Sequence, residues 1–262
     1  MIHDYFNLPF QGLQEVRCPY FNNTRANLRA QLRALVGKGT PQEIVEEARI
    51  ISIQYQAGFF DKNGVSCPSY KQTGQSANPE DLRRFLIAHH LGIECSGFVT
   101  NVLREHFKQT KHLDFLKKMF FVSPWHGIRW LIARLRPVEN MSVRRYADDR
   151  NTIRLKELTS IAPADVIIML ETGPTNKRNH IILITDVRPE AGSTTVTYVH
   201  ARAWASEGQF GHGVSRGTIT ISAPDKSLLE QTWTENGLVN DANETYLEAK
   251  KAKRLEIRRV TV

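Results

Sequence analysis

The sequence predicts an α+β fold in which a helical first half precedes an antiparallel sheet. Apolar residues recur at helical spacing up to about residue 136, and short runs of β-branched and apolar residues follow from residue 165. Helices followed by strands, with short turns rich in Gly, Pro and Asn, are typical of this class. At 262 residues and 41% hydrophobic, the chain is long enough to bury a substantial core.

Residues 1–78 predict an irregular arm followed by a helical extension. We expect a helix over 24–36, and the capping box Thr40-Pro41-Gln42-Glu43 predicts the start of a second one. The residues expected on the buried face of that second helix are Ile44, Ala48, Ile51 and Tyr55. The loop-like stretch 58–79 then predicts a boundary, so residues 79–262 would form the main domain, which contains all the candidate site residues described below.

The next two helices bring a cysteine to a helix start. Asn78 and Pro79 have the cap-then-proline pattern of a helix that runs to about His90, and Cys95 opens the following one. Unpaired N–H groups and the dipole at a helix N-terminus favour a thiolate, which is the nucleophilic form of cysteine. Gly97 would keep the backbone beside the sulfur bare, so that a substrate carbonyl can approach.

The second half of the chain predicts a helical insert and then a sheet. We expect the insert at about 109–160, with a break at Ser123-Pro124. The expected strands are Asp165–Leu170, His180–Thr185, Thr194–His200, Gly217–Ile221 and Arg254–Val262.

Two of the nine histidines are candidates for the base that a thiolate nucleophile needs. His180 opens an otherwise apolar strand, and His200 closes the next one. Residues 189–193 form a turn that reverses the chain between them, so the two rings can be neighbours in an antiparallel pair. We therefore predict that His180 accepts the thiol proton and that His200 orients the ring of His180.

Charge and cysteine content limit the remaining possibilities. A net charge of +8 favours a polyanionic contact, which could be an anionic cell-wall polymer, anionic lipid or nucleic acid, but no nucleic-acid recognition motif accompanies it. Three cysteines are too few for a disulfide scaffold; Cys18 and Cys67 would be buried thiols or, in an exported protein, a bridge. No metal-ligand or phosphate-loop spacing occurs, so we expect no metal and no cofactor.

The sequence contains neither a membrane-spanning run nor the basic and apolar regions of a signal peptide. We therefore expect no transmembrane segment. The compartment stays open: a cytoplasmic location is the default, and export is the alternative if the natural chain begins further upstream.

Four segments resemble, in order, the motifs of one enzyme family. Glu94-Cys95-Ser96-Gly97-Phe98-Val99 is similar to Asp-Cys-Ser-Gly-Phe/Leu-Val, and Pro163-Ala164-Asp165-Val166 is similar to Pro-Gly-Asp-Leu. Asn179–Ile184 resembles a His-Val-Gly-Ile strand, and Tyr198–Ala201 resembles the strand with a third polar residue. These are motifs of NlpC/P60 cysteine peptidases, papain-like enzymes that cleave peptidoglycan stem peptides.

The resemblance covers about residues 92–205 and implies a papain-like core with the nucleophile helix packed on the sheet. It implies Cys95 as nucleophile, His180 as base and His200 as the orienting residue. The candidate substrate-binding residues that go with it are Glu94, Ser96, Gly97 and Trp204.

The chain departs from the family pattern at several positions. Glu94 replaces Asp, and we expect its carboxylate to point toward a substrate amine or Ser96, because a negative charge facing the sulfur would oppose the thiolate. The family's Tyr-x-Trp-Gly-Gly segment has only a weak counterpart at Tyr70–Gly74, and Ile182 stands where a Gly is common. The insert would also reshape the cleft.

The expected activity is hydrolysis of an amide through a thioester acyl-enzyme at Cys95, with a backbone N–H stabilising the oxyanion. By resemblance, the substrate is a peptide of the cell wall. Two alternatives stay open: a thiol acyltransferase or non-peptidoglycan amidase on the same scaffold, and a binding module without catalysis.

Overall fold

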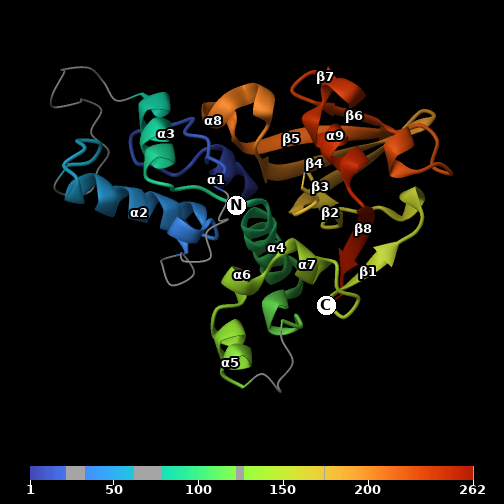
Figure 1. Cartoon of the computed structure of the whole chain (residues 1–262), viewed down its shortest axis with the longest axis horizontal. Helices are drawn as coiled ribbons and strands as arrows, with labels where there is room; N and C mark the ends of the chain where they lie inside the picture. The colour runs from blue at the N-terminus through green and yellow to red at the C-terminus, as the bar shows by residue number, and fades with distance from the viewer. Residues whose placement is uncertain (22–32, 62–77, 122–126, 174, 262) are drawn as a thin grey trace. The chain divides into compact units, whose positions relative to one another are not determined.

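A computed structural model describes residues 1–21, 33–61, 78–121, 127–173 and 175–261 (Figure 1). The chain forms two compact units. The first contains residues 1–98 and 201–214, and the second contains residues 99–200 and 215–262. The boundary that we predict near residue 78 falls within the first unit and stays a prediction.

The first unit is mainly helical. Its elements are α1 (Ile2–Phe6), η2 (Ala34–Val36), α2 (Pro41–Gln54), α3 (Pro79–Ala88), the start of α4 (Cys95–Lys111), η6 (Ala205–Glu207) and α8 (Gly208–Gly211). The predicted capping box opens α2: the Glu43 N–H donates to Thr40 Oγ1, and the Thr40 N–H donates to the Glu43 carboxylate. Asn78 caps α3 in the same way, by accepting from the Asp81 N–H. The helix expected over 24–36 lies mostly outside the described residues, and only the short η2 is seen at its end.

The core of the first unit joins the N-terminal arm to the helices. Tyr5 is fully buried; its hydroxyl donates to the Gly39 carbonyl (2.8 Å), and its ring meets that of Phe98 edge-on. Ile44, Ala48 and Ile51 are buried on one face of α2, as predicted. Tyr55 is exposed, contrary to the prediction, because it is the C-cap and no longer has helical backbone angles.

The second unit contains an antiparallel sheet with the strand order β1-β8-β2-β3-β4-β5-β6-β7. The strands are β1 (Thr152–Leu155), β2 (Val166–Thr172), β3 (Arg178–Glu190), β4 (Ser193–Arg202), β5 (Gly213–Ile221), β6 (Thr232–Glu235), β7 (Leu238–Val239) and β8 (Arg254–Val260). The last residues of β4 and the first of β5 belong to the first unit. The α+β class is therefore confirmed.

Helices and helical turns of the second unit precede the sheet or connect its strands. They are the rest of α4, η3 (Phe115–Lys117), α5 (Ile128–Leu135), α6 (Pro137–Asn140), α7 (Val143–Tyr146), η5 (Leu158–Ser160), η7 (Leu228–Glu230), η8 (Asn240–Ala242) and α9 (Glu244–Lys251). α7 contacts β2 and β3, and α9 contacts β2. Thr100 of α4 hydrogen-bonds Tyr146 of α7 (2.9 Å), so this part of α4 is linked to the sheet through α7.

Three strands depart from the sequence-based expectation. β1 lies within the region predicted as a helical insert, and its partner is β8, a strand about a hundred residues later that local periodicity does not reveal. β6 and β7 form a hairpin that we did not predict. Asn236 and Gly237 connect them with positive φ at both positions (51° and 76°), which is the backbone of a tight two-residue turn. The predicted break at Ser123-Pro124 lies outside the described residues.

The β3–β4 hairpin follows the prediction closely. Glu190 pairs with Ser193, so Ala191 and Gly192 alone make the turn. Ile182 and Ile184 of β3 join Val196 and Tyr198 of β4 in one buried cluster with Trp233, as the period of two requires. This hairpin determines where His180 and His200 lie.

Asp165 joins the start of β2 to the last strand. It is 1% exposed, accepts from the Ala162 N–H (2.8 Å), and forms two hydrogen bonds with the guanidinium of Arg259 (2.7 and 2.8 Å). A two-pronged bond of this kind is stronger than a single charged contact. It fixes β8 beside the strand that leads to the histidine hairpin.

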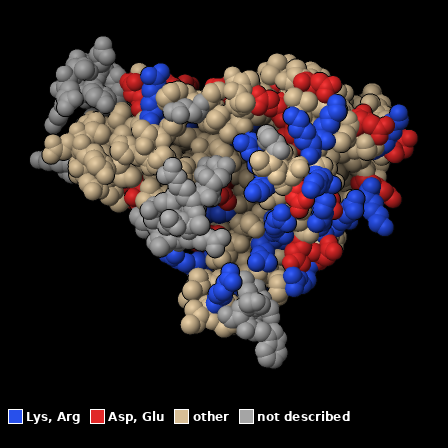
Figure 2. Space-filling model, viewed as in Figure 1, with Lys and Arg blue, Asp and Glu red and all other residues tan. Residues whose placement is uncertain are grey.

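Acidic and basic side chains are interspersed over the sheet side of the second unit (Figure 2). Exposed arginines pair with nearby carboxylates, as in Arg150 with Asp148 (2.6 Å), Arg188 with Asp186 (2.5 Å) and Arg144 with Glu171 (3.4 Å). Some of the basic side chains are thus paired locally, and such exposed pairs contribute little to stability.

Glu248 on α9 makes the stability of the protein depend on pH. Burial raises the pKa of its carboxyl from 4.5 to about 7. The folded state therefore favours the protonated acid: this contribution is complete below pH 4.5 and is lost as the pH rises through 7. The unaltered protein should lose on the order of 2 to 3 kcal/mol of stability from this group between pH 5 and pH 8, and we expect Glu248→Gln to remove that loss. Urea unfolding of both proteins at the two pH values measures this, and equal pH dependence would contradict it.

Candidate active site

Cys95 is the first residue of α4. The Phe98 N–H donates to the Glu94 carbonyl (2.9 Å), which closes the first helical turn around Cys95. The residue is 6% exposed and carries a thiol rather than a disulfide. N–H groups of the first turn have no acceptor within the helix, and the helix dipole favours negative charge at this end. The predicted position of Cys95 at a helix start is confirmed, and its thiolate form stays a prediction.

The neighbours of Cys95 form a charged cluster with a buried lysine. Glu94 Oε1 accepts from Lys38 Nζ (2.5 Å) and from Ser96 Oγ (2.5 Å). Lys38 Nζ also lies 2.6 Å from Ser96 Oγ, and the lysine is only 5% exposed. Of the two directions expected for Glu94, the one toward Ser96 is observed, and the amine that it meets is that of Lys38. Substrate binding by Glu94 and Ser96 stays a prediction.

Gly97 has a different role from the one expected. A Cβ at this position would lie 2.3 Å from the Gly37 carbonyl oxygen. That carbonyl also accepts from the Glu94 N–H (3.0 Å), and Gly37 itself has φ of +72°. Gly97 is therefore required by the close approach of the 34–39 loop within the first unit, and the space beside its Cα is occupied by main chain. The idea that Gly97 leaves room for a substrate carbonyl is wrong for this side of the helix.

The second unit brings the two candidate histidines together. His180 Nε2 lies 2.7 Å from His200 Nδ1, and both residues are buried. His180 is the third residue of β3, and His200 lies two residues before the end of β4. The strands are longer than predicted, yet the antiparallel pairing makes the rings neighbours.

Glu235 continues the chain of contacts behind His200. Its carboxylate lies 3.1 and 3.2 Å from His200 Nε2, and both residues are essentially inaccessible. Three hydroxyl groups also donate to this carboxylate, those of Tyr198 (2.9 Å), Ser215 (2.6 Å) and Thr245 (3.0 Å). A buried group that receives so many donors is suited to the ionised, acceptor-only form.

The Glu235 carboxylate determines which atoms donate and which accept in the hydrogen bonds from His180 through His200 to Glu235. Because its oxygens only accept, His200 Nε2 must donate, which makes Nδ1 of neutral His200 the acceptor. His180 Nε2 then donates to His200 Nδ1, and the lone pair of neutral His180 resides on Nδ1. With both rings neutral, Glu235 thereby determines which ring nitrogen of His180 carries the lone pair, and the role of His180 as a base stays a prediction.

Cys95 belongs to the first unit. The hydrogen-bonded residues His180, His200 and Glu235 belong to the second. Trp204, a candidate substrate-binding residue, is in the first unit and only 3% exposed. Its ring stacks on the Arg202 guanidinium (3.7 Å), and its carbonyl accepts from His212 Nε2 (2.9 Å). Its role toward a substrate stays a prediction.

The comparisons with known proteins return no match, neither to a family model, nor to a curated protein, nor to a solved structure. Among the described residues, no group of three or more His, Cys, Asp and Glu side chains has the arrangement of a metal site. None of the described helices combines the length and the apolar character that a bilayer crossing requires.

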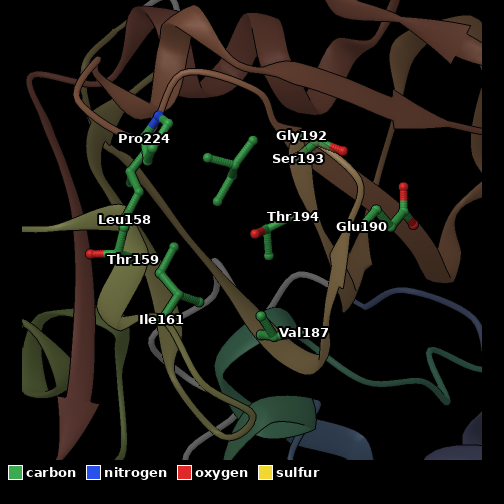
Figure 3. Close-up of a pocket in the computed structure, with 10 residues that line it drawn as sticks. Leu158, Thr159, Ile161, Val187, Glu190, Gly192, Ser193, Thr194 and Pro224 are labelled. Carbon is green, nitrogen blue, oxygen red and sulfur yellow. The ribbon is translucent and has the colours of Figure 1, made fainter.

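A pocket of about 250 Å³ lies elsewhere in the second unit (Figure 3). Leu158, Ile161 and Pro224 line one side, and the β3–β4 turn with Glu190 and Ser193 lines the other. None of the residues with candidate chemistry borders it. The pocket is therefore distinct from the histidine chain.

Sequence reasoning missed two residues of the site. Glu235 had a signal: the Asn236-Gly237 pair that follows it predicts a hairpin, and the alternation in that hairpin puts Trp233 and Glu235 on one face. No local sequence pattern indicates Lys38, because its partners Glu94 and Ser96 are more than fifty residues away. Cys18 is a buried thiol whose Sγ contacts the Pro19 carbonyl (3.6 Å), and its suggested partner Cys67 lies outside the described residues.

Proposed function

We propose that this chain is a cysteine hydrolase of the papain-like NlpC/P60 type that cleaves an amide bond in a peptidoglycan stem peptide. The observation that carries the proposal is the buried row of contacts from His180 through His200 to Glu235, in which a carboxylate lies behind a pair of histidines. The thiol of Cys95 at a helix start and the four motif resemblances support it. A papain-like core requires the two units to bring Cys95 and His180 together.

In the proposed reaction, His180 Nδ1 accepts the proton of the Cys95 thiol as sulfur attacks the amide carbonyl carbon. The oxyanion receives hydrogen bonds from backbone N–H groups of the first turn of α4. His180 then donates the proton to the amine leaving group, and a thioester remains on Cys95. Water, deprotonated by His180, hydrolyses the thioester and restores the thiol.

His200 and Glu235 each support His180 in the proposed reaction. When His180 is protonated, its Nε2–H keeps the hydrogen bond to His200 Nδ1, so the ring does not rotate away. The Glu235 carboxylate compensates the positive charge through His200. The three hydroxyls on Glu235 hold the carboxylate in place without neutralising it.

Digestion of purified muropeptides with the full chain tests the proposal. Mass spectrometry is expected to identify two fragments whose combined mass exceeds that of the substrate by one water. Fragments joined to an added amine acceptor, with no hydrolysed product, would indicate acyl transfer instead. Intact muropeptides after prolonged incubation would refute the proposed substrate.

A further inference from the structure

An exposed apolar stripe runs along α5 in the second unit. Its members are Ile128, Leu131, Ile132 and Leu135, at positions i, i+3, i+4 and i+7. They are 77%, 50%, 48% and 72% exposed, although such spacing normally faces a core. Ala133 is buried on the other side, so the helix packs on the protein through a different face.

Arginines border this stripe on both sides. An α-helix turns by about 100° per residue, so the four apolar side chains span an arc of about 100°. Arg129 then lies beside Ile132, and Arg134 lies beside Leu131, one on each edge of the arc. Arg134 also covers the ring of Trp130 at 5.0 Å. The helix itself carries no acidic residue.

The surrounding segment is also basic. Residues 111–141 contain six Lys or Arg and two Asp or Glu. One of the acids, Asp114, is paired with Arg104 (2.9 Å). Figure 2 shows Lys and Arg atoms beside uncharged atoms at the bottom of the view, where Figure 1 draws α5. An apolar arc with cationic borders is the pattern of helices that lie in the plane of a membrane surface.

We propose that the α5 stripe binds the surface of an anionic membrane. The aliphatic side chains would enter the boundary between headgroups and acyl chains, while Arg129 and Arg134 meet lipid phosphates. A hydrated anionic polymer would also attract the arginines, but it offers no apolar phase for four aliphatic side chains. This binding is independent of the hydrolytic reaction and would place the enzyme beside a bilayer.

Flotation of the full chain with lipid vesicles tests the proposal. We expect binding to phosphatidylcholine vesicles with about 30% phosphatidylglycerol, weaker binding to pure phosphatidylcholine, and release at about 0.5 M salt. Ile128→Glu with Leu135→Glu is expected to weaken binding at least about tenfold, and so is Arg129→Gln with Arg134→Gln. All four side chains lie on the exposed face or its borders, so the variants should fold.

The matched control is Leu238→Glu with Val239→Glu, which adds the same charges at exposed apolar positions of β7 (41% and 47% exposed). This control should bind vesicles like the unaltered chain, and so should Cys95→Ala. Equal binding by the α5 glutamate variant would overturn the proposal, as would equal affinity for neutral and anionic vesicles. A dimer of the unaltered chain in light scattering that the α5 glutamate variant dissociates would assign the stripe to a second copy instead.

Discussion

Cys95→Ala is expected to lower the rate of muropeptide hydrolysis on the order of 10⁴-fold or more while the protein stays folded. Without sulfur no thioester forms, and the histidine chain has no nucleophile to activate. The side chain is small and lies at a helix start, so its truncation should cost about 1 kcal/mol of stability. The rate is measured by chromatography of the fragments, and the fold by circular dichroism and thermal unfolding.

Cys18→Ala is the matched control, since it removes the other described thiol of the first unit. Cys18 is fully buried, and burial raises the pKa of its thiol well above the ordinary value, so it does not ionise near neutrality. Its alanine variant should lose a similar amount of stability and keep full activity. Hydrolysis that survives in Cys95→Ala, or an equal loss in Cys18→Ala, would contradict the assignment of the nucleophile.

Glu235→Gln is expected to reduce kcat about 10- to 100-fold with little change in KM, because Glu235 is a positioning residue that acts through His200. The amide nitrogen of glutamine can donate to His200 Nε2. His200 Nδ1 would then carry the hydrogen and donate to His180 Nε2, which moves the lone pair of His180 away from Nδ1. A base of the wrong tautomer cannot accept the thiol proton at that nitrogen. Steady-state kinetics on muropeptides separates the kcat effect from the KM effect.

Glu256→Gln controls for the loss of a buried carboxylate in the same sheet. Glu256 on β8 is 9% exposed and accepts from Arg258 (3.0 Å), but among its described contacts none is with a histidine. The Glu256→Gln variant should lower the free energy of unfolding without changing kcat. Glu235→Ala gives a further readout: four donors lose their acceptor, so the free energy of unfolding should fall by about 3 to 5 kcal/mol. Equal kcat in Glu235→Gln and the unaltered protein would refute the tautomer argument.

The sequence was most informative where the relevant signal is local. The caps at Thr40 and Asn78, the helix start at Cys95 and the β3–β4 hairpin each depend on residues within a few positions, and the structure contains them as expected. The meeting of His180 and His200 followed from strand alternation and one reversal of the chain.

Long-range partners account for what the sequence left out. Lys38 forms an ion pair with Glu94, which is 56 residues later in the sequence. β1 pairs with β8, which is about a hundred residues later. Gly97 illustrates a different failure: a missing side chain is compatible with access for a substrate and with close packing of another segment. Only the position of the Gly37 carbonyl distinguishes the two.

The place of β8 in the sheet has a consequence for how the protein folds. β8 lies between β1 and β2, so residues 254–260 form an interior strand rather than an edge. During synthesis, β1 to β7 emerge before β8, and one edge of β2 stays unpaired until residue 260 has left the ribosome. Pairings across such distances form slowly, since the loop must close before any contact compensates the lost entropy. The Arg259–Asp165 contact is therefore expected late in folding, and a chain stalled before β8 would expose β2 to aggregation.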